Sequence, residues 1–168
     1  MKSIIIFGGS GYVGKNLIRS FVKKGFKIII PYQRQIDEAN LRLFGSVGQI
    51  IPFHFTSLKN PKLLSVLKNA YICINLKTTW DSKESYLEKS IYKFKESTSI
   101  KKFIFFSGLG TERRSTLRNE IILKTEDLIS KELKNSIIIR PSVILGNGDQ
   151  FLSSLLPIFK MSFFIPLF

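Results

Sequence analysis

The chain has 168 residues, 44% of them hydrophobic, and carries 26 Lys and Arg against 12 Asp and Glu, for a formal charge of +14. This length predicts one globular domain that buries roughly two thirds of the surface of its unfolded chain. A nucleic-acid partner is disfavoured because 19 of the basic residues are Lys, spread over every segment, whereas a dedicated patch would use the forked donors of Arg.

The first predicted element is a buried strand, Ile4–Phe7, followed by glycines at 8, 11 and 14 and an amphipathic helix that ends at Gly25. In this context Gly8 can form a tight turn, Gly11 leaves room for a pyrophosphate, and Gly14 lets the helix pack closely on the strand. The free N–H groups of the first helical turn would face the phosphates. The stretch predicts a dinucleotide site that includes Gly8, Ser10, Gly11, Tyr12, Val13 and Gly14. The alternative is a glycine-rich turn without a ligand.

The second predicted strand, Phe26–Ile30, ends at Pro31-Tyr32-Gln33-Arg34. An acidic residue near this position usually holds the ribose 2′-OH of NAD, whereas an Arg accommodates the 2′-phosphate of NADP. Because nothing acidic precedes Asp37, Arg34 favours NADP(H) over NAD(H). The alternative is a surface Arg at a strand end.

Further strands and helices alternate along the rest of the chain. We expect strands over residues 50–55, 70–76, 103–106 and 137–139, and helices over 61–67, 80–97 and 116–133. This order predicts an α/β fold, a Rossmann-like doubly wound parallel sheet over residues 1–150, with an apolar helix or tail over 151–168. Right-handed crossovers would bring Gly8, Arg34, Thr56, Leu76, Ser107 and Pro141 to one rim, where ligands bind.

Other features limit the range of functions. Cys73 and His54 are each the single residue of their type, so the sequence predicts neither a disulfide within the chain nor a metal site. The chain enters its first strand without room for a signal peptide, and no apolar run is long enough to span a membrane. We therefore expect a cytoplasmic protein without a transmembrane segment, for which peripheral membrane contact stays open.

Several segments resemble one known group of proteins. The matching residues are the glycine loop 8–14, Ile30–Arg34, Leu41–Gln49, Asn75-Leu76, Lys101–Ile104, Leu117–Asn119, Arg140–Ser142 and Gly146–Phe151. Over essentially the whole chain they are similar to atypical short-chain dehydrogenase/reductase proteins, which are NAD-dependent epimerase/dehydratase-like, and in particular to relatives of the NADPH-binding accessory subunit of respiratory complex I. The Pro-Tyr-x-Arg and Gly-x-x-Gly-Gln segments are not general dinucleotide-binding features, so the resemblance is specific.

The resemblance implies roles for several residues. The glycine loop would hold the pyrophosphate, and Arg34 would lie by the adenosine 2′-phosphate. Leu76-Lys77 and Pro141-Ser142 would line the nicotinamide half. Thr56 stands where relatives have an Asp that can bind the adenine amino group, and Thr78 stands where they have a Gly. These two departures leave open a weaker cofactor site than in relatives.

The residues for catalysis are incomplete. Active members of the wider superfamily use a Tyr four residues before a Lys, with a nearby Ser, and Ser107 stands where that Ser would. No tyrosine follows Tyr92, so the catalytic Tyr is absent. Glu120 precedes Lys124 by the same interval, but the pair is more simply an i,i+4 contact on a helix surface. We predict no catalytic residue, and Ser107, Glu120 and Lys124 are the candidates to test.

The end of the chain is mostly apolar over Met161–Phe168 and should be covered. Relatives continue well past this segment, so the resemblance implies a truncated chain whose substrate lobe is largely missing. A shortened or split reading frame, a second polypeptide that completes the fold, and a protein partner docked on the apolar C-terminus all stay open.

The leading hypothesis is an NADP(H)-binding, non-catalytic domain linked to a respiratory complex or quinone-related assembly, peripheral to the inner face of the membrane. The alternative is an NAD(P)-dependent oxidoreductase or epimerase completed by a second chain. A third hypothesis, suggested by the charge alone, is a basic binder of nucleic acid or of a membrane surface.

Overall fold

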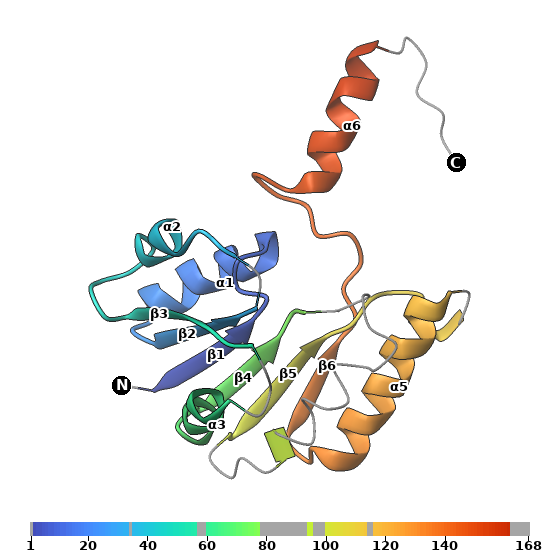
Figure 1. The fold of residues 1–168 in the computed structure, drawn as a ribbon. Helices are drawn as coiled ribbons and strands as arrows, with labels where there is room; N and C mark the ends of the chain where they lie inside the picture. Colours follow the sequence, from blue (N-terminus) through green and yellow to red (C-terminus); the bar gives the residue numbers. More distant parts are fainter. Residues whose placement is uncertain are drawn as a thin grey trace.

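The computed structural model of the chain describes residues 2–33, 35–56, 60–77, 94–95, 100–113 and 116–161. Within these residues one sheet of six parallel strands has the order β3-β2-β1-β4-β5-β6 (Figure 1). The predicted Rossmann-like parallel sheet is therefore confirmed, and the carboxyl ends of all its strands lie on one rim.

The elements follow the predicted alternation with small shifts at their ends. The strands are β1 (Ser3–Phe7), β2 (Lys27–Tyr32), β3 (Ile50–His54), β4 (Ile72–Asn75), β5 (Lys102–Phe106) and β6 (Ser136–Ile139). The helices are α1 (Tyr12–Lys23), α2 (Glu38–Arg42), α3 (Pro61–Lys68), the short 3-10 helix η1 (Thr111–Arg113), α5 (Leu117–Glu132) and α6 (Gln150–Met161). The helix expected over 80–97 lies outside the described residues except for Phe94 and Lys95, which are helical.

Two strands contain a proline, which the sheet order accommodates. β2 continues through Pro31 and Tyr32, beyond Ile29, the last of its residues paired with β1. Pro52 lies in β3 at the edge of the sheet, where a strand can lack one backbone donor. The strand predicted to end at Ile30 is longer because its last residues pair with β3 alone.

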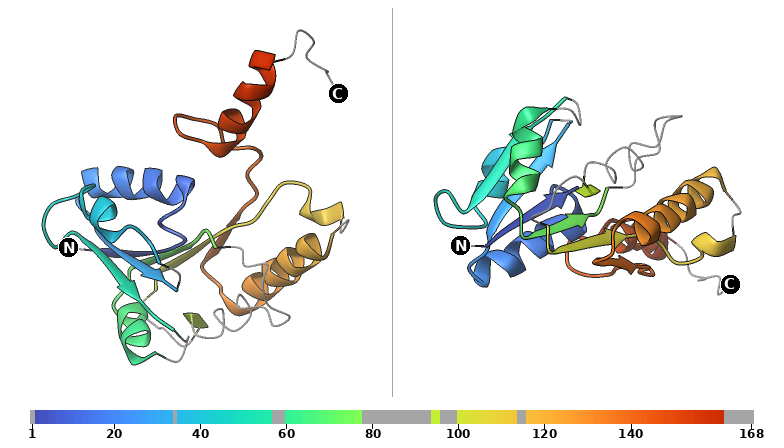
Figure 2. Two further views of the ribbon diagram at one scale, coloured as in Figure 1. Left: turned by 45° about the horizontal axis from the view of Figure 1, so that its top comes forward. Right: turned by 90° about the horizontal axis from the view of Figure 1, so that it is seen from below.

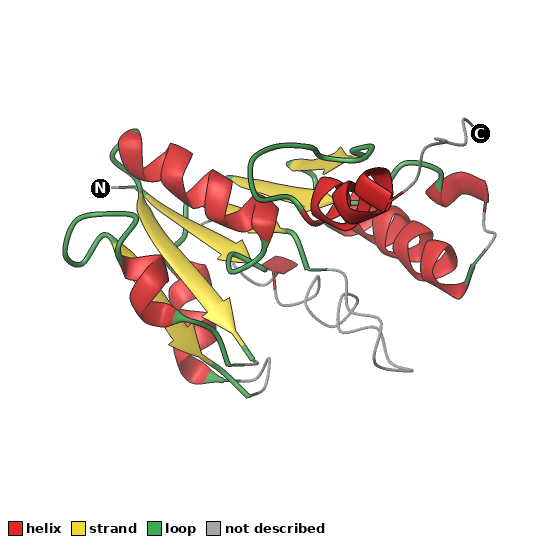
Figure 3. Ribbon diagram, turned by 90° about the horizontal axis from the view of Figure 1, so that it is seen from above, coloured by secondary structure: helices red, strands yellow, loops and turns green. Residues whose placement is uncertain are grey.

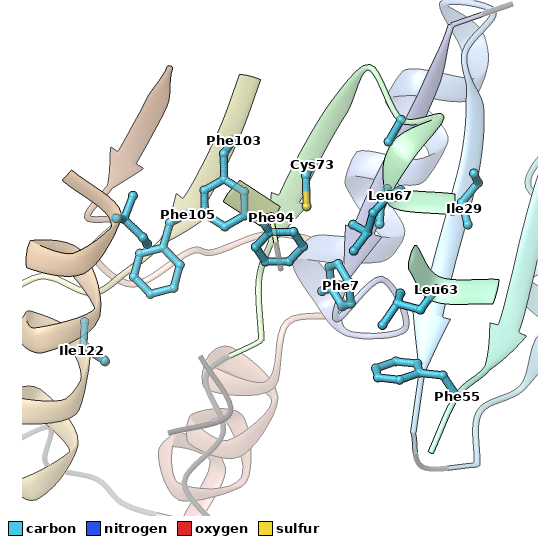
Figure 4. Close-up of a cluster of buried hydrophobic side chains, with 13 residues drawn as sticks. Phe7, Ile29, Phe55, Leu63, Leu67, Cys73, Phe94, Phe103, Phe105 and Ile122 are labelled. Carbon is cyan, nitrogen blue, oxygen red and sulfur yellow. The ribbon is translucent and has the colours of Figure 1, made fainter. Parts of the chain in front are cut away.

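Each face of the sheet has its own core because successive side chains of a strand point to opposite sides. One core is rich in aromatic residues and joins the strands to α3 and α5 (Figure 4). Phe94 packs in it between Phe7 and Phe103. Burial in this core raises the pKa of the Cys73 thiol.

The second core is almost purely aliphatic and joins the strands to α1 and α2. Its largest contributors are isoleucines of β1 and β2, together with Ile18 of α1 and Leu41 of α2. Figure 2 (right) and Figure 3 show the helices on both sides of the twisted sheet. Helix α2 was not predicted because it is five residues long and presents a single buried side chain.

The β6 end of the sheet is less covered on the α1 side. Ile104 and Phe106 of β5 pack against the aliphatic core on the α1 side. Their partners in β6, Ile137 and Ile139, are 40% and 37% exposed. Helix α6 extends away from the sheet in both Figure 1 and Figure 2. No helix among the described residues is long and apolar enough to cross a membrane.

We expect the exposed end of β6 to drive self-association of the isolated chain, since it combines an apolar face with an edge strand. Ile139→Lys should raise the apparent dissociation constant for self-association by about tenfold, measured by sedimentation velocity. Leu43→Lys is the matched control, because Leu43 is 79% exposed and lies beyond α2, on the other half of the sheet. Equal association of both variants would contradict this expectation.

Candidate functional site

The turn after β1 is built on Gly8. Its φ of +79° lies in the left-handed region that side chains rarely adopt, and its carbonyl oxygen accepts a hydrogen bond from the Gly11 N–H at 3.1 Å. A Cβ added at Gly8 would lie 3.3 Å from the backbone of Leu76 and Lys77. The predicted tight turn is confirmed, and the end of β4 packs directly against it.

Gly14 allows α1 to contact this turn. A Cβ at Gly14 would lie 2.6 Å from the Gly8 carbonyl oxygen and from the Gly9 Cα, both of them backbone atoms. At Gly11, by contrast, the nearest atom to an added Cβ is the Gly8 oxygen at 3.4 Å. Gly14 is thus needed for packing, whereas Gly11 leaves space in front of the helix.

The N-terminus of α1 suits an anion. Gly11 is the N-cap and provides no side-chain hydrogen bond, and the first turn contains no acidic residue. The N–H groups of this turn, which begins with Tyr12 and Val13, lack partners within the helix and lie at the positive end of its dipole. A phosphate in front of Gly11 would satisfy them.

A cavity of about 350 Å³ opens beside this turn. Its walls come from the glycine turn, the end of β2, the loops that follow β2 and β3, and the end of β4. The lining residues are Phe7, Gly8, Gly9, Ser10, Gly11, Ile30, Pro31, Tyr32, Gln33, Ile36, Phe55, Leu76 and Lys77. Five residues predicted for the site thus share one cavity: Gly8, Ser10, Gly11, Leu76 and Lys77.

Apolar side chains from three segments line the same cavity, and the sequence analysis did not single them out. Ile30, Ile36 and Phe55 are among the cavity's lining residues. Ordinary strand and loop patterns contain such residues, so only their position beside the glycine turn identifies them. Arg34, the residue predicted to choose between the cofactors, and Thr78 lie outside the described residues.

Two acidic residues near the end of β2 have partners of their own. Asp37 caps α2, accepting a hydrogen bond from the Asn40 N–H at 3.0 Å. Glu38 accepts hydrogen bonds from the Tyr32 hydroxyl and, at 3.2 Å, from Arg42 Nη2. The Tyr32 hydrogen bond lowers the pKa of the Glu38 carboxyl and raises the pKa of Tyr32. Neither carboxylate lines the cavity.

Ser107 lies at the end of β5 in a different arrangement. Its hydroxyl donates to Glu126 of α5, which is only 3% exposed and also accepts from Arg140 Nε at 3.1 Å. Burial raises the pKa of Glu126, but the hydrogen bonds from Arg140 and Ser107 outweigh it, so this pKa lies below its ordinary value. The group ties together the ends of β5 and β6.

The other predicted site residues lie outside the cavity wall. Thr56 is exposed beyond Phe55, and the Pro141 carbonyl accepts the Leu109 N–H at 3.1 Å. Glu120 and Lys124 are exposed on α5, as the surface-pair interpretation expects. The described residues contain no cluster of three or more His, Cys, Asp or Glu side chains suited to a metal ion.

The chain is similar in sequence to a subunit of mitochondrial NADH dehydrogenase [ubiquinone]. It is 26% identical to the mitochondrial NADH dehydrogenase [ubiquinone] 1 alpha subcomplex subunit 9 of Rattus norvegicus over 88% of this chain and 42% of that protein. The Arabidopsis thaliana protein of the same name is 26% identical over 96% of this chain and 43% of its own length. The resemblance found in the sequence is confirmed, and the chain spans less than half the length of these relatives. No protein-family model matches the chain.

Solved structures agree on the fold. NmrA, a negative transcriptional regulator solved in complex with NADP, matches with a TM-score of 0.67 over 83% of this chain and 44% of that one, at 14% identity. At this identity the match supports the Rossmann-like architecture alone.

The packing at Gly14 gives a first prediction. Gly14→Ala should lower the free energy of unfolding by about 1–3 kcal/mol, because the added methyl group meets backbone that must shift. Urea denaturation measures this change. Gly108→Ala is the control, since its Cβ would find only Thr111 Cγ2 at 3.7 Å. Equal stability of the two variants would show that α1 does not depend on this contact.

The Glu126 group predicts a pH dependence. Glu126→Gln should lower the free energy of unfolding at pH 7 by about 1 kcal/mol, a small value because the Arg140 side chain is 45% exposed. Since the folded-state pKa of Glu126 is depressed, its stabilisation is present at neutral pH and is lost as the pH falls below about 4. The difference between variant and wild type should therefore shrink as the pH falls below the ordinary pKa of a glutamate.

Thermal unfolding at pH 7 and pH 3 tests this, with Glu120→Gln, an exposed change on the same helix, as the control. A difference for Glu126→Gln that persists unchanged at low pH would rule out the carboxylate as its origin.

Proposed function

We propose that this chain is an NADP(H)-binding, non-catalytic domain that serves an assembly related to respiratory complex I. The observation that carries the proposal is the glycine turn, which places an uncapped helix N-terminus beside a mostly apolar cavity. Its relatives of matching sequence are complex I subunits, and a protein of the same fold was solved with NADP.

The residues around the cavity fit the adenosine and pyrophosphate part of a dinucleotide. Gly11 leaves space in front of the first turn of α1, where the N–H groups would hold the pyrophosphate. Ser10 lies in the same wall, and Ile30, Ile36 and Phe55 offer apolar surface for an adenine ring. The nicotinamide ring would supply hydride chemistry if a substrate were available.

Two observations favour NADP(H) over NAD(H). A carboxylate free to bind the ribose 2′-OH would favour NAD, but Asp37 caps α2 and Glu38 is held by Tyr32 and Arg42. Arg34 follows Gln33, a residue of the cavity wall, and its guanidinium would pair with a 2′-phosphate. Both carboxylates near the end of β2 are thus occupied by hydrogen bonds within the chain, and the sequence places an Arg at this strand end, as suits NADP(H).

The candidate catalytic side chains have structural partners or lie on the surface, which supports a non-catalytic domain. Ser107, the counterpart of a catalytic Ser, donates its hydroxyl to the buried Glu126. The sequence offers no tyrosine after Tyr92 to act as a base, and Glu120 and Lys124 are exposed on α5. In this proposal Ser107 stabilises the rim of the sheet and does not touch a substrate.

A protein partner is part of the proposal. Val143 and Leu145 after β6 are 57% and 54% exposed, and Phe151 and Leu156 of α6 are 49% and 53% exposed. The surface that these side chains and Ile139 expose is apolar, which water disfavours. We propose that a protein of the assembly covers this surface and the apolar end of the chain, at the inner face of the respiratory membrane.

Gly11→Asp tests the cofactor site without disturbing the fold. The backbone at Gly11 is extended (φ −73°), and an Asp at this N-cap can accept the first-turn N–H groups, so α1 should be at least as stable. The same carboxylate would occupy and repel the pyrophosphate position. Isothermal titration calorimetry should show NADPH binding to the wild type and a loss of at least about 100-fold in the variant.

Gly11→Asn, which has the same shape without the charge, separates repulsion from steric exclusion and should bind more tightly than Gly11→Asp. A folded Gly11→Asp protein that binds NADPH as well as the wild type would refute the proposed site.

A further inference from the structure

The side chain of Lys77 crosses the glycine turn. β4 and β2 flank β1 on opposite sides in the sheet, and Lys77 follows the end of β4. Its Nζ donates a hydrogen bond of 2.7 Å to Oε1 of Gln33, which follows the end of β2. The ammonium group of a residue from the β4 side therefore lies at the β2 side of the cavity.

The backbone of Lys77 is held in place by buried contacts. Its N–H donates to Oδ1 of Asn75 at 2.9 Å, and Asn75 is only 3% exposed. A Cβ at Gly8 would lie 3.3 Å from the Lys77 nitrogen, so the glycine turn and this segment are in close contact. The direction in which the Lys77 side chain leaves the chain is thus fixed by the same turn that shapes the cavity.

The other end of the contact is also anchored. The carbonyl oxygen of Gln33 lies 3.2 Å from Nε2 of His54, at the end of the neighbouring strand β3. Both Gln33 and Lys77 are half-buried and line the cavity. Because the ammonium group carries a positive charge and Lys77 lines the cavity, an anion in the cavity would be attracted to it.

We propose that Lys77, positioned by Gln33, binds the 2′-phosphate of NADP(H) and so favours this cofactor over NAD(H). The inference rests on the proposed function, in which the adenosine ribose lies at the end of β2. The resemblance to relatives implied that Leu76-Lys77 lines the nicotinamide half. In this proposal the backbone of the segment keeps that expected place, while Nζ, beside Gln33 at the end of β2, serves the adenosine ribose. A charge-assisted hydrogen bond to phosphate gives Lys77 a role that a neutral side chain cannot fill.

Two small ligands isolate the contact. Adenosine 2′,5′-bisphosphate and adenosine 5′-monophosphate differ only in the 2′-phosphate, and calorimetric titration at fixed ionic strength measures both affinities. Lys77→Met should weaken binding of the bisphosphate by at least about tenfold and change binding of the monophosphate by less than about twofold. Lys77→Arg keeps the cation and should restore most of the affinity for the bisphosphate.

Lys102→Met is the matched control, because Lys102 is exposed at the start of β5, at the amino end of its strand and so away from the rim that carries the cavity, and its loss changes the net charge by the same amount. It should leave both affinities unchanged. Gln33→Leu should weaken binding of the bisphosphate less than Lys77→Met does, since Gln33 positions the ammonium group and does not itself carry the charge.

The outcomes separate this inference from the proposed function. The role of Lys77 would be overturned if the wild type binds both ligands and Lys77→Met either leaves both affinities unchanged or weakens both equally. The proposed cofactor site would remain in that case. A folded wild-type chain that binds neither ligand would overturn both. A loss in Lys102→Met as large as that in Lys77→Met would attribute the effect to net charge and also overturn the inference.

Discussion

The structure depends on the contact between helix α1 and the turn that precedes it. At Gly14 the helix backbone lies so close to Gly8 and Gly9 that there is no room for a Cβ atom. This contact fixes the direction of α1, and hence the position of its N–H groups relative to the ends of the strands. It also leaves the space in front of Gly11 that a phosphate would use. One packing constraint thus produces both the local fold and the anion site.

The side chains at the ends of the strands have different roles on the two halves of the rim. At β1, β2 and β4 they surround a cavity, whereas at β5 and β6 the side chains of Ser107 and Arg140 close on the buried Glu126. In the proposed function the first half of the sheet holds the cofactor, whereas the second half uses its polar groups to stabilise the ends of its strands. This division is what the proposal of a cofactor-binding domain expects.

Much of the fold could be predicted because it depends on local patterns. The glycine spacing, the short apolar runs and the helical periodicity of α5 specify the elements and their parallel order, and the tight turn at Gly8 follows from the same pattern. Contacts between distant segments could not be predicted in this way. The reach of Lys77 to Gln33 and the commitment of Glu38 to Tyr32 depend on how neighbouring strand ends are spaced, which no single segment encodes. Short α2, with one buried residue, left too weak a pattern to detect.

The most direct test of the central claim is a titration of the purified chain with NADPH, in which nucleotide fluorescence and melting temperature are followed together. A ligand that binds only the folded state raises stability by RT ln(1 + [L]/Kd), so both signals must give the same Kd. We predict saturable fluorescence and a melting temperature that rises with the NADPH concentration. A folded chain that shows neither change would contradict a working cofactor site.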